Sequence, residues 1–179
     1  MQKRVTVCDR DFEVFIPADA IDKAVERIAN QINNDMIGKV PLFLIVLNGA
    51  FMFASDLLKK VKVENNLSFV KLSSYSGTKS TQLVNELIGL NEVIKDRSVI
   101  IVEDIIDTGL TVRRMLDILH QQEVGEVKIA TLFHKPEAFR SNYKIDYIGM
   151  EIENHFILGY GLDYDGFARN LPDIYKLVE

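Results

Sequence analysis

The chain has 179 residues, a formal net charge of −5, 47% hydrophobic residues and 26% charged residues. This length can bury a full core, and the composition is that of a globular protein, so we expect one domain over residues 1–179. The mild acidic balance argues against nonspecific nucleic-acid binding, and no apolar run is long enough to span a membrane. The single cysteine, Cys8, excludes an internal disulfide, and with no signal peptide the expected location is cytoplasmic.

The first half of the chain alternates between helical and strand patterns. An apolar stripe at helical spacing predicts a helix over residues 17–37, because Pro17 suits a first helical turn and Gly38 suits a C-terminal stop. A continuous apolar run at residues 42–47 predicts a strand buried on both faces. The other elements expected here are short strand and turn at 4–16, a helix from about 50 to 60, a strand at 67–72, a polar loop at 73–82 and a strand at 83–90.

The segment at residues 99–111, with the sequence VIIVEDIIDTGLT, is the centre of the chain. Four apolar residues predict a buried strand, and Glu103 and Asp104 then interrupt the apolar run. Apolar residues at helical spacing follow from Val112 to Leu119, so the segment is a strand, a turn and a helix.

This turn has the properties of an anion site. The first N–H groups of a helix have no partner inside the helix, and the helix dipole adds partial positive charge there. Gly109 lets the backbone approach a ligand, and Thr108 and Thr111 add hydroxyl donors, so the turn predicts a cup for a phosphate group. Acids beside a phosphate would repel it, unless a divalent cation or ligand hydroxyls bind to the carboxylates.

Two more strands are expected in the second half, at residues 127–133 and 145–152. The first ends at Lys135, and a lysine in such a place is often a surface residue whose stem packs on the core. Taken singly, Phe156 could equally be a core aromatic, and Asp163 and Arg169 could form a surface ion pair.

The thirteen residues at 99–111 closely resemble the phosphoribosyl-pyrophosphate (PRPP) signature of type I phosphoribosyltransferases. The form Glu-Asp-Ile-Ile-Asp-Thr-Gly is similar to that of hypoxanthine-guanine phosphoribosyltransferases. The resemblance implies an α/β fold with a mostly parallel twisted sheet flanked by helices. It also implies a flexible active-site loop and a small purine-binding hood, built largely from about residues 150–179 with the N-terminal segment.

The resemblance also implies a role for individual residues. Asp107 would act as the general base, and the whole PRPP and 5′-phosphate set would be Glu103, Asp104, Asp107, Thr108, Gly109, Leu110 and Thr111. Pyrophosphate would be bound by Asn48, Gly49 and Arg169, and Mg²⁺ would be bound by Glu103, Asp104 and Asp163. The flap would carry Ser74 and Tyr75. The purine would be bound by Ile105, Lys135, Phe156, Ile157 and Asp163.

The loop at Asn48 and Gly49 departs from the family in one respect. Relatives commonly carry lysine where this chain has Asn48, so a contact to pyrophosphate is expected from the backbone here. The resemblance further implies a non-proline cis peptide immediately before Gly49.

The implied activity is purine salvage, in which PRPP and a 6-oxopurine (hypoxanthine, guanine or xanthine) give a purine 5′-monophosphate, such as IMP or GMP, and pyrophosphate. The resemblance further implies a homodimer or homotetramer. Three alternatives remain open at this point. They are a phosphoribosyltransferase for xanthine, adenine or a pyrimidine, a PRPP-binding regulator of the same fold that binds RNA or DNA, and a flavodoxin-like domain that binds some other phosphate. The acidic balance and the presence of Asp107 argue against the regulator.

Overall fold

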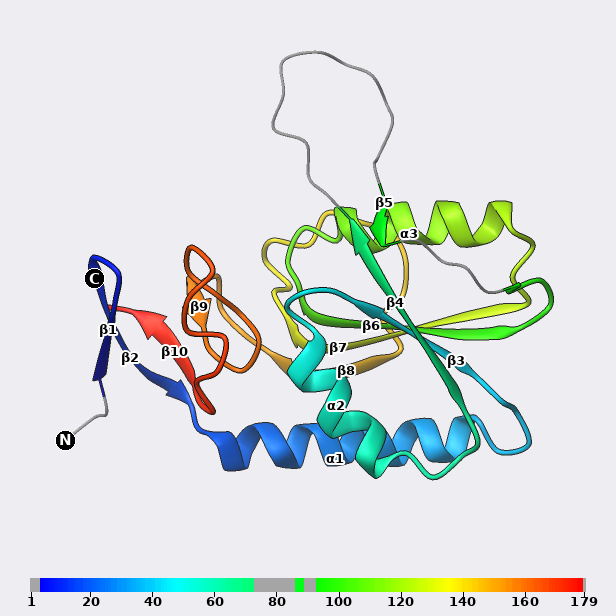
Figure 1. The fold of residues 1–179 in the computed structure, drawn as a ribbon, viewed down its shortest axis with the longest axis horizontal. Helices are drawn as coiled ribbons and strands as arrows, with labels where there is room; N and C mark the ends of the chain where they lie inside the picture. The colour runs from blue at the N-terminus through cyan, green and yellow to red at the C-terminus, as the bar shows by residue number, and fades with distance from the viewer. Residues whose placement is uncertain (1–3, 73–85, 89–92, 179) are drawn as a thin grey trace, which may run out of the picture.

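A mostly parallel β-sheet forms the centre of the molecule (Figure 1). The computed structural model describes residues 4–72, 86–88 and 93–178. Within these ranges the strands lie side by side in the order β5-β4-β3-β6-β7-β8, and β5 runs antiparallel to the others. The strands are β3 (Leu42–Val46), β4 (Asn66–Leu72), β5 (Glu86–Ile88), β6 (Ser98–Ile106), β7 (Glu126–His134) and β8 (Tyr147–Glu151).

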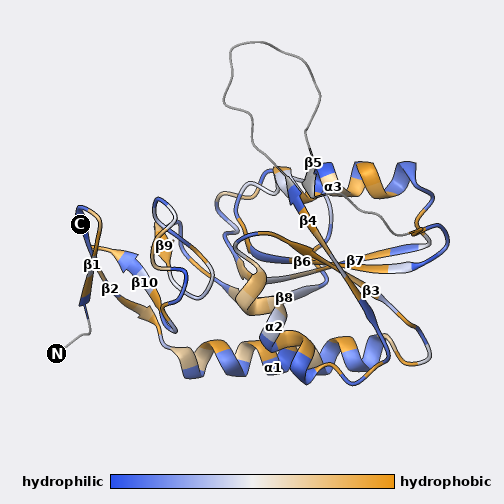
Figure 2. Ribbon diagram, in the orientation of Figure 1, coloured by the Kyte–Doolittle hydropathy of each residue, from blue (hydrophilic) through white to orange (hydrophobic). Residues whose placement is uncertain are grey.

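Helices cover both faces of this sheet (Figure 1). Helices α1 (Ala18–Asp35) and α2 (Phe51–Lys60) pack on one face, and α3 (Leu110–Gln121) packs on the other. Successive residues of β6 therefore enter different cores: Ile100 and Val102 lie on the α1 and α2 side, and Val99 and Ile101 lie on the α3 side. This double burial explains the unbroken apolar runs in the sequence. Figure 2 shows hydrophobic central strands beside helices in which hydrophobic and hydrophilic residues alternate.

A second, antiparallel sheet lies at one end of the molecule, on the left of Figure 1. It joins both ends of the chain, since its strand order is β1-β2-β10-β9. The strands are β1 (Arg4–Val7), β2 (Arg10–Ile16), β9 (Ile157–Leu158) and β10 (Ile174–Leu177). Its small core contains Phe12, Leu158 and Tyr175, all fully buried.

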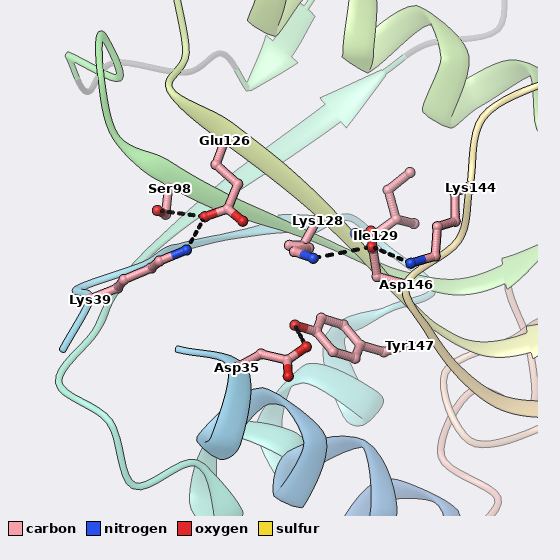
Figure 3. Close-up of polar contacts among 9 residues, drawn as sticks. All are labelled: Asp35, Lys39, Ser98, Glu126, Lys128, Ile129, Lys144, Asp146 and Tyr147. Carbon is pink, nitrogen blue, oxygen red and sulfur yellow. Dashed lines mark hydrogen bonds and ion pairs between the residues drawn. The ribbon is translucent and has the colours of Figure 1, made fainter. Parts of the chain in front are cut away.

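Polar contacts close the edge of the large sheet where β6 and β7 begin (Figure 3). The Lys39 ammonium lies 2.5 Å from a Glu126 carboxylate oxygen, which also accepts a hydrogen bond from Ser98. Tyr147 donates its hydroxyl hydrogen to Asp35 of α1 at 3.0 Å. The opposite edge, at the carboxyl ends of the strands, is where open α/β sheets bind ligands.

The expected α/β class, with a mostly parallel sheet flanked by helices, is confirmed. Pro17 caps the first helix instead of starting it, and the strand expected at 83–90 is described only as β5. The flap residues Ser74 and Tyr75 lie outside the described residues. Among the described helices, none is both long and apolar enough to cross a membrane.

Candidate active site

The turn between β6 and α3 forms a pocket. It is lined by residues 105–112 together with Glu103, which includes the whole expected phosphate cup from Asp107 to Thr111. Gly109 is the N-cap of α3 with φ at +82°, a conformation that side chains disfavour. A Cβ on Gly109 would also lie 2.6 Å from the Phe139 ring, so both backbone and packing require glycine.

The two adjacent acids of β6 point to opposite sides of the strand. Glu103 lines this pocket on the α3 side, and its Oε2 atom is buried and has no hydrogen-bond partner among the residues that the structure describes. Asp104 lies on the other side against Gly49, where a Cβ on that glycine would come within 1.8 Å of its Oδ2 atom. Both acids were expected to bind the same ligand groups from their positions in the sequence, whereas in the structure they face two different parts of the site.

Burial raises the pKa of both carboxyl groups. The pKa of Glu103 lies well above its ordinary value because of burial and, to a smaller degree, because of the neighbouring Asp104 charge. Burial raises the pKa of Asp104 to about 6, although backbone N–H groups and Arg169 oppose this rise. A carboxyl group that loses its hydration in this way gains from a cation or a hydroxyl donor supplied by a ligand.

Replacing Asp104 with asparagine is expected to stabilise the ligand-free protein above about pH 6. The pKa of Asp104 is about 6 in the folded protein against 3.8 ordinarily, so between these values the folded protein keeps a proton that the unfolded chain has released. The free energy of unfolding therefore falls as the pH rises through this interval, by about 3 kcal/mol, and the variant lacks this loss. Urea denaturation in the presence of a metal chelator, at about pH 4 and pH 8, measures the effect.

The two proteins should differ little in stability at about pH 4, where both side chains are neutral in the folded protein and the Asp104 carboxyl of the unfolded chain is only partly ionised. Asp117→Asn, on the exposed face of α3, is the matched control and should leave stability unchanged at both pH values. A wild-type protein at least as stable as the Asp104→Asn variant at pH 8 would contradict the prediction.

The loop between β3 and α2 contains a cis peptide bond between Leu47 and Asn48. The resemblance implied this bond immediately before Gly49, so that expectation was wrong by one position. Asn48 is exposed. Gly161 packs against the carbonyl oxygen of Gly49, and a Cβ added to Gly161 would lie 2.1 Å from this oxygen.

Arg169 and Asp163 come from the loop that packs on Gly49. Their side chains form an ion pair of 2.6 Å, and Arg169 Nη1 also donates to the carbonyl of Gly161 at 2.7 Å. The charges of both residues affect the pKa of Asp104, so they lie near that carboxyl group. The ion pair considered from the sequence is therefore real, and it lies beside the loop that contains Asn48 and Gly49.

The three carboxylates expected to bind Mg²⁺ do not gather into one cluster. In the part of the chain that the structure describes, no three His, Cys, Asp or Glu residues form a group that could hold a metal ion. Asp104 and Asp163 lie on one side of β6, and Glu103 lies on the other. This arrangement still fits Mg²⁺, which usually takes one or two carboxylates together with water and substrate phosphate oxygens.

Lys135 connects the phosphate pocket to the small sheet. Its ammonium is buried and donates to the carbonyl of His155 at 2.8 Å and to Asn154 Oδ1 at 3.3 Å. It also lies 3.6 Å from a carboxylate oxygen of Asp107, a residue of the phosphate cup. The structure thus brings together two residues, Lys135 and Asp107, that are 28 positions apart in the sequence.

Phe156, Ile157 and Ile105, which were also expected to bind the purine, each lie next to or near a residue of this part of the site. Phe156 directly follows the residue that Lys135 contacts; its side chain is half-exposed and its ring neighbours are Phe12 and Tyr164. Ile157 is buried in β9, and Ile105 is half-buried near the end of β6 beside the pocket. An exposed aromatic face next to the lysine can stack on a planar ring.

Sequence reasoning missed several residues that support the site. Tyr143 donates its hydroxyl hydrogen to the carbonyl of Gly109 at 2.9 Å, and Tyr160 donates to Asp56 of α2 at 2.6 Å. His155 had no assigned role, and its carbonyl oxygen holds Lys135. No pattern in the sequence marks these contacts, because each joins segments that only the tertiary structure brings together.

The pocket and the buried carboxylates lie at the edge where open α/β sheets bind ligands, and comparison with known families gives the class of protein. The family model described as phosphoribosyl transferase domain matches residues 17–165. The chain therefore belongs to the phosphoribosyltransferase family.

Within this family, the relatives carry a more specific name. Hypoxanthine-guanine phosphoribosyltransferases from Streptococcus thermophilus and Streptococcus pneumoniae are 40% and 38% identical to the chain, over 93% of its length and 92% and 93% of theirs. The crystal structure of a hypoxanthine phosphoribosyltransferase from Staphylococcus aureus is 34% identical and has a TM-score of 0.86, with 93% of this chain and 91% of that chain covered.

Proposed function

We propose that the protein is a purine-salvage phosphoribosyltransferase that transfers the 5-phosphoribosyl group of PRPP to a 6-oxopurine. The names of its relatives support this function, and one contact in the structure supports a 6-oxopurine as the base. Lys135 Nζ and Asp107 Oδ2 lie 3.6 Å apart at the end of the phosphate pocket. In a 6-oxopurine, N7 and O6 lie side by side on one edge of the ring. The pair can therefore bind both atoms at once.

In this proposal Lys135 donates a hydrogen bond to O6, and Asp107 accepts the proton of N7. The purine N9 atom bonds to the anomeric carbon of ribose as the bond from that carbon to pyrophosphate breaks, and the products are a purine 5′-monophosphate and pyrophosphate. Adenine carries an amino group at this position, which cannot accept the lysine hydrogen bond, so a site that donates there rejects it. Phe156 would stack on one face of the base and Ile105 would pack on the other, with Ile157 and Asp163 completing the purine site.

The two acids of β6 have separate tasks in this scheme. Glu103, with its unpartnered Oε2 atom in the phosphate pocket, would accept hydrogen bonds from the ribose hydroxyls. The N–H groups and hydroxyls from Asp107 to Thr111 would bind the 5′-phosphate. Both carboxylates would also favour positive charge on the ribose ring in the transition state.

The pyrophosphate end would lie at the loop of Asn48 and Gly49, with Arg169 beside it. Asp104 and Asp163 would hold Mg²⁺ there, together with oxygens of PRPP. When bound, Mg²⁺ supplies electrostatic stabilisation to the leaving pyrophosphate. The flap expected at Ser74 and Tyr75 would exclude water from the reacting centre.

The function is tested with hypoxanthine, guanine, xanthine, adenine and uracil, each supplied with PRPP and Mg²⁺ while pyrophosphate release is followed. We expect release with hypoxanthine and guanine, and release with adenine or uracil slower by roughly 10⁴-fold. Release that is fastest with adenine or uracil would overturn the 6-oxopurine assignment. No release with any base, together with salt-dependent binding of RNA, would support the regulator, which the names of the relatives do not favour.

We further propose that residues 1–179 act as one cytoplasmic domain, with the antiparallel sheet as the purine-binding hood, and that the protein is a homodimer or homotetramer. Large apolar side chains remain exposed at the start of α2 and on β4, namely Phe51, Leu67 and Phe69. Apolar groups exposed in this way often mark interfaces between subunits. Light scattering that gives the 20.4 kDa mass of a single chain would contradict the oligomer.

A further inference from the structure

Residues 139–143, which follow β7, lie behind the phosphate-binding turn and hold two of its carbonyl groups. The backbone N–H of Arg140 donates to the carbonyl oxygen of Thr108 at 3.1 Å, and the Ser141 hydroxyl donates to the same oxygen at 3.4 Å. The Tyr143 hydroxyl donates to the carbonyl oxygen of Gly109 at 2.9 Å, and the same oxygen accepts the Arg113 N–H of α3 at 3.0 Å. None of the residues 139–143 lines the pocket, so these donors reach the turn from the outside.

The direction of these carbonyl groups determines where the N–H groups of the turn point. In a trans peptide the C=O and the following N–H lie in one plane and point in opposite directions. With the oxygens of Thr108 and Gly109 facing residues 139–143, the N–H groups of Gly109 and Leu110 point away from that segment, toward the side of the pocket, and the Leu110 N–H also lies 3.5 Å from the Thr108 hydroxyl oxygen. An anion is bound by N–H groups that already point toward it.

We propose that Tyr143 and Ser141 are positioning residues that orient the peptide groups of the phosphate-binding turn and so set the affinity for the 5′-phosphate of PRPP. The inference rests on the proposed function, because the ligand is the sugar phosphate of that reaction. The two residues act through Thr108 and Gly109 and touch no substrate.

The surroundings of Tyr143 keep its hydroxyl protonated, so that it can donate a hydrogen bond. Burial, and secondly the charge of Glu103, raise the pKa of its hydroxyl to about 12. The hydroxyl therefore keeps its hydrogen at any pH at which the enzyme works. The Phe139 ring packs between this tyrosine and His134, and it lies against the position a Gly109 Cβ would take, so an apolar contact supports the same turn.

The test compares Tyr143→Phe, Ser141→Ala and the double variant with the wild-type protein. Tyr143→Phe removes one hydrogen bond and keeps the ring, so KM for PRPP should rise roughly 3- to 10-fold while kcat and KM for the purine base stay within about twofold. Ser141→Ala should have a smaller effect, because the Ser141 hydrogen bond is longer, at 3.4 Å against 2.9 Å for that of Tyr143. Tyr147→Phe is the matched control: its hydroxyl bonds Asp35 of α1 at the far edge of the sheet, so KM for PRPP should not change (Figure 3).

Binding of ribose 5-phosphate, measured by calorimetry, separates this inference from the proposed function. If the wild-type protein binds ribose 5-phosphate and Tyr143→Phe binds it more weakly, the inference stands even when no base gives pyrophosphate. An unchanged affinity and an unchanged KM for PRPP in the folded Tyr143→Phe variant would overturn it. A lower kcat together with a similar rise in KM for PRPP and in KM for the purine base would also overturn it, because such a result indicates general damage to the fold. No binding by the wild-type protein would overturn both the inference and the assignment of the phosphate pocket.

Discussion

Replacing Asp107 with asparagine is expected to lower kcat by roughly 10²- to 10⁴-fold, the usual worth of a general base. Asparagine has the same shape and can still accept a hydrogen bond, but it cannot take the proton of N7. Binding of PRPP should change little, because the N–H groups of the turn remain. Lys135 should also stay in place, since His155 and Asn154 hold it independently of Asp107.

Steady-state rates of pyrophosphate release with hypoxanthine, at varied PRPP concentrations, measure this effect. Asp117→Asn makes the same chemical change on the exposed face of α3 and should leave kcat unchanged. An Asp107→Asn variant with unimpaired turnover would remove the assignment of Asp107 as the base.

Replacing Lys135 with methionine is expected to remove most of the preference for 6-oxopurines. Methionine fills a similar buried volume but donates no hydrogen bond to O6. A site built to donate a hydrogen bond rejects an analogue without the acceptor by roughly 10⁴- to 10⁵-fold. We therefore expect the ratio of kcat/KM for hypoxanthine to that for adenine to fall by at least about 100-fold, mainly through the loss of activity with hypoxanthine.

Both rates are measured with the same protein sample under the same conditions. A general loss of active protein lowers both rates equally and leaves their ratio unchanged. Lys128→Met is the matched control, because Lys128 is a partly buried lysine that pairs with Asp146 at 3.4 Å at the other edge of the sheet (Figure 3). A Lys135→Met variant that keeps the wild-type ratio would show that the base is selected elsewhere.

The phosphate pocket shows how much of a site can be predicted from a short segment. Glycine, threonines and acids between a buried strand and a helix predict an anion cup, and the structure forms a pocket from these same residues at Asp107 to Thr111. Local backbone geometry is enough here, because the N–H groups and hydroxyls of the turn all come from consecutive positions. The resemblance to a family added the PRPP assignment.

The two acids of β6 show where a local pattern is insufficient. Adjacent residues in a strand point to opposite faces, so Glu103 faces the phosphate pocket and Asp104 faces Gly49. From the sequence, the two acids were expected to act together and to bind Mg²⁺ with Asp163. Which residues surround each carboxylate depends on the loops that pack on each side of the strand.

The amino-acid sequence by itself determined the α/β class, the buried strands and the turn between β6 and α3, because hydrophobic periodicity and turn chemistry act over a few neighbouring residues. Only the tertiary structure decided that Lys135 lies beside Asp107, that Arg169 and Gly161 lie by the loop of Gly49, and that Tyr143 supports Gly109. These contacts join segments that are distant in the chain, and their formation depends on how strands and loops pack in three dimensions, which periodicity along the sequence does not encode.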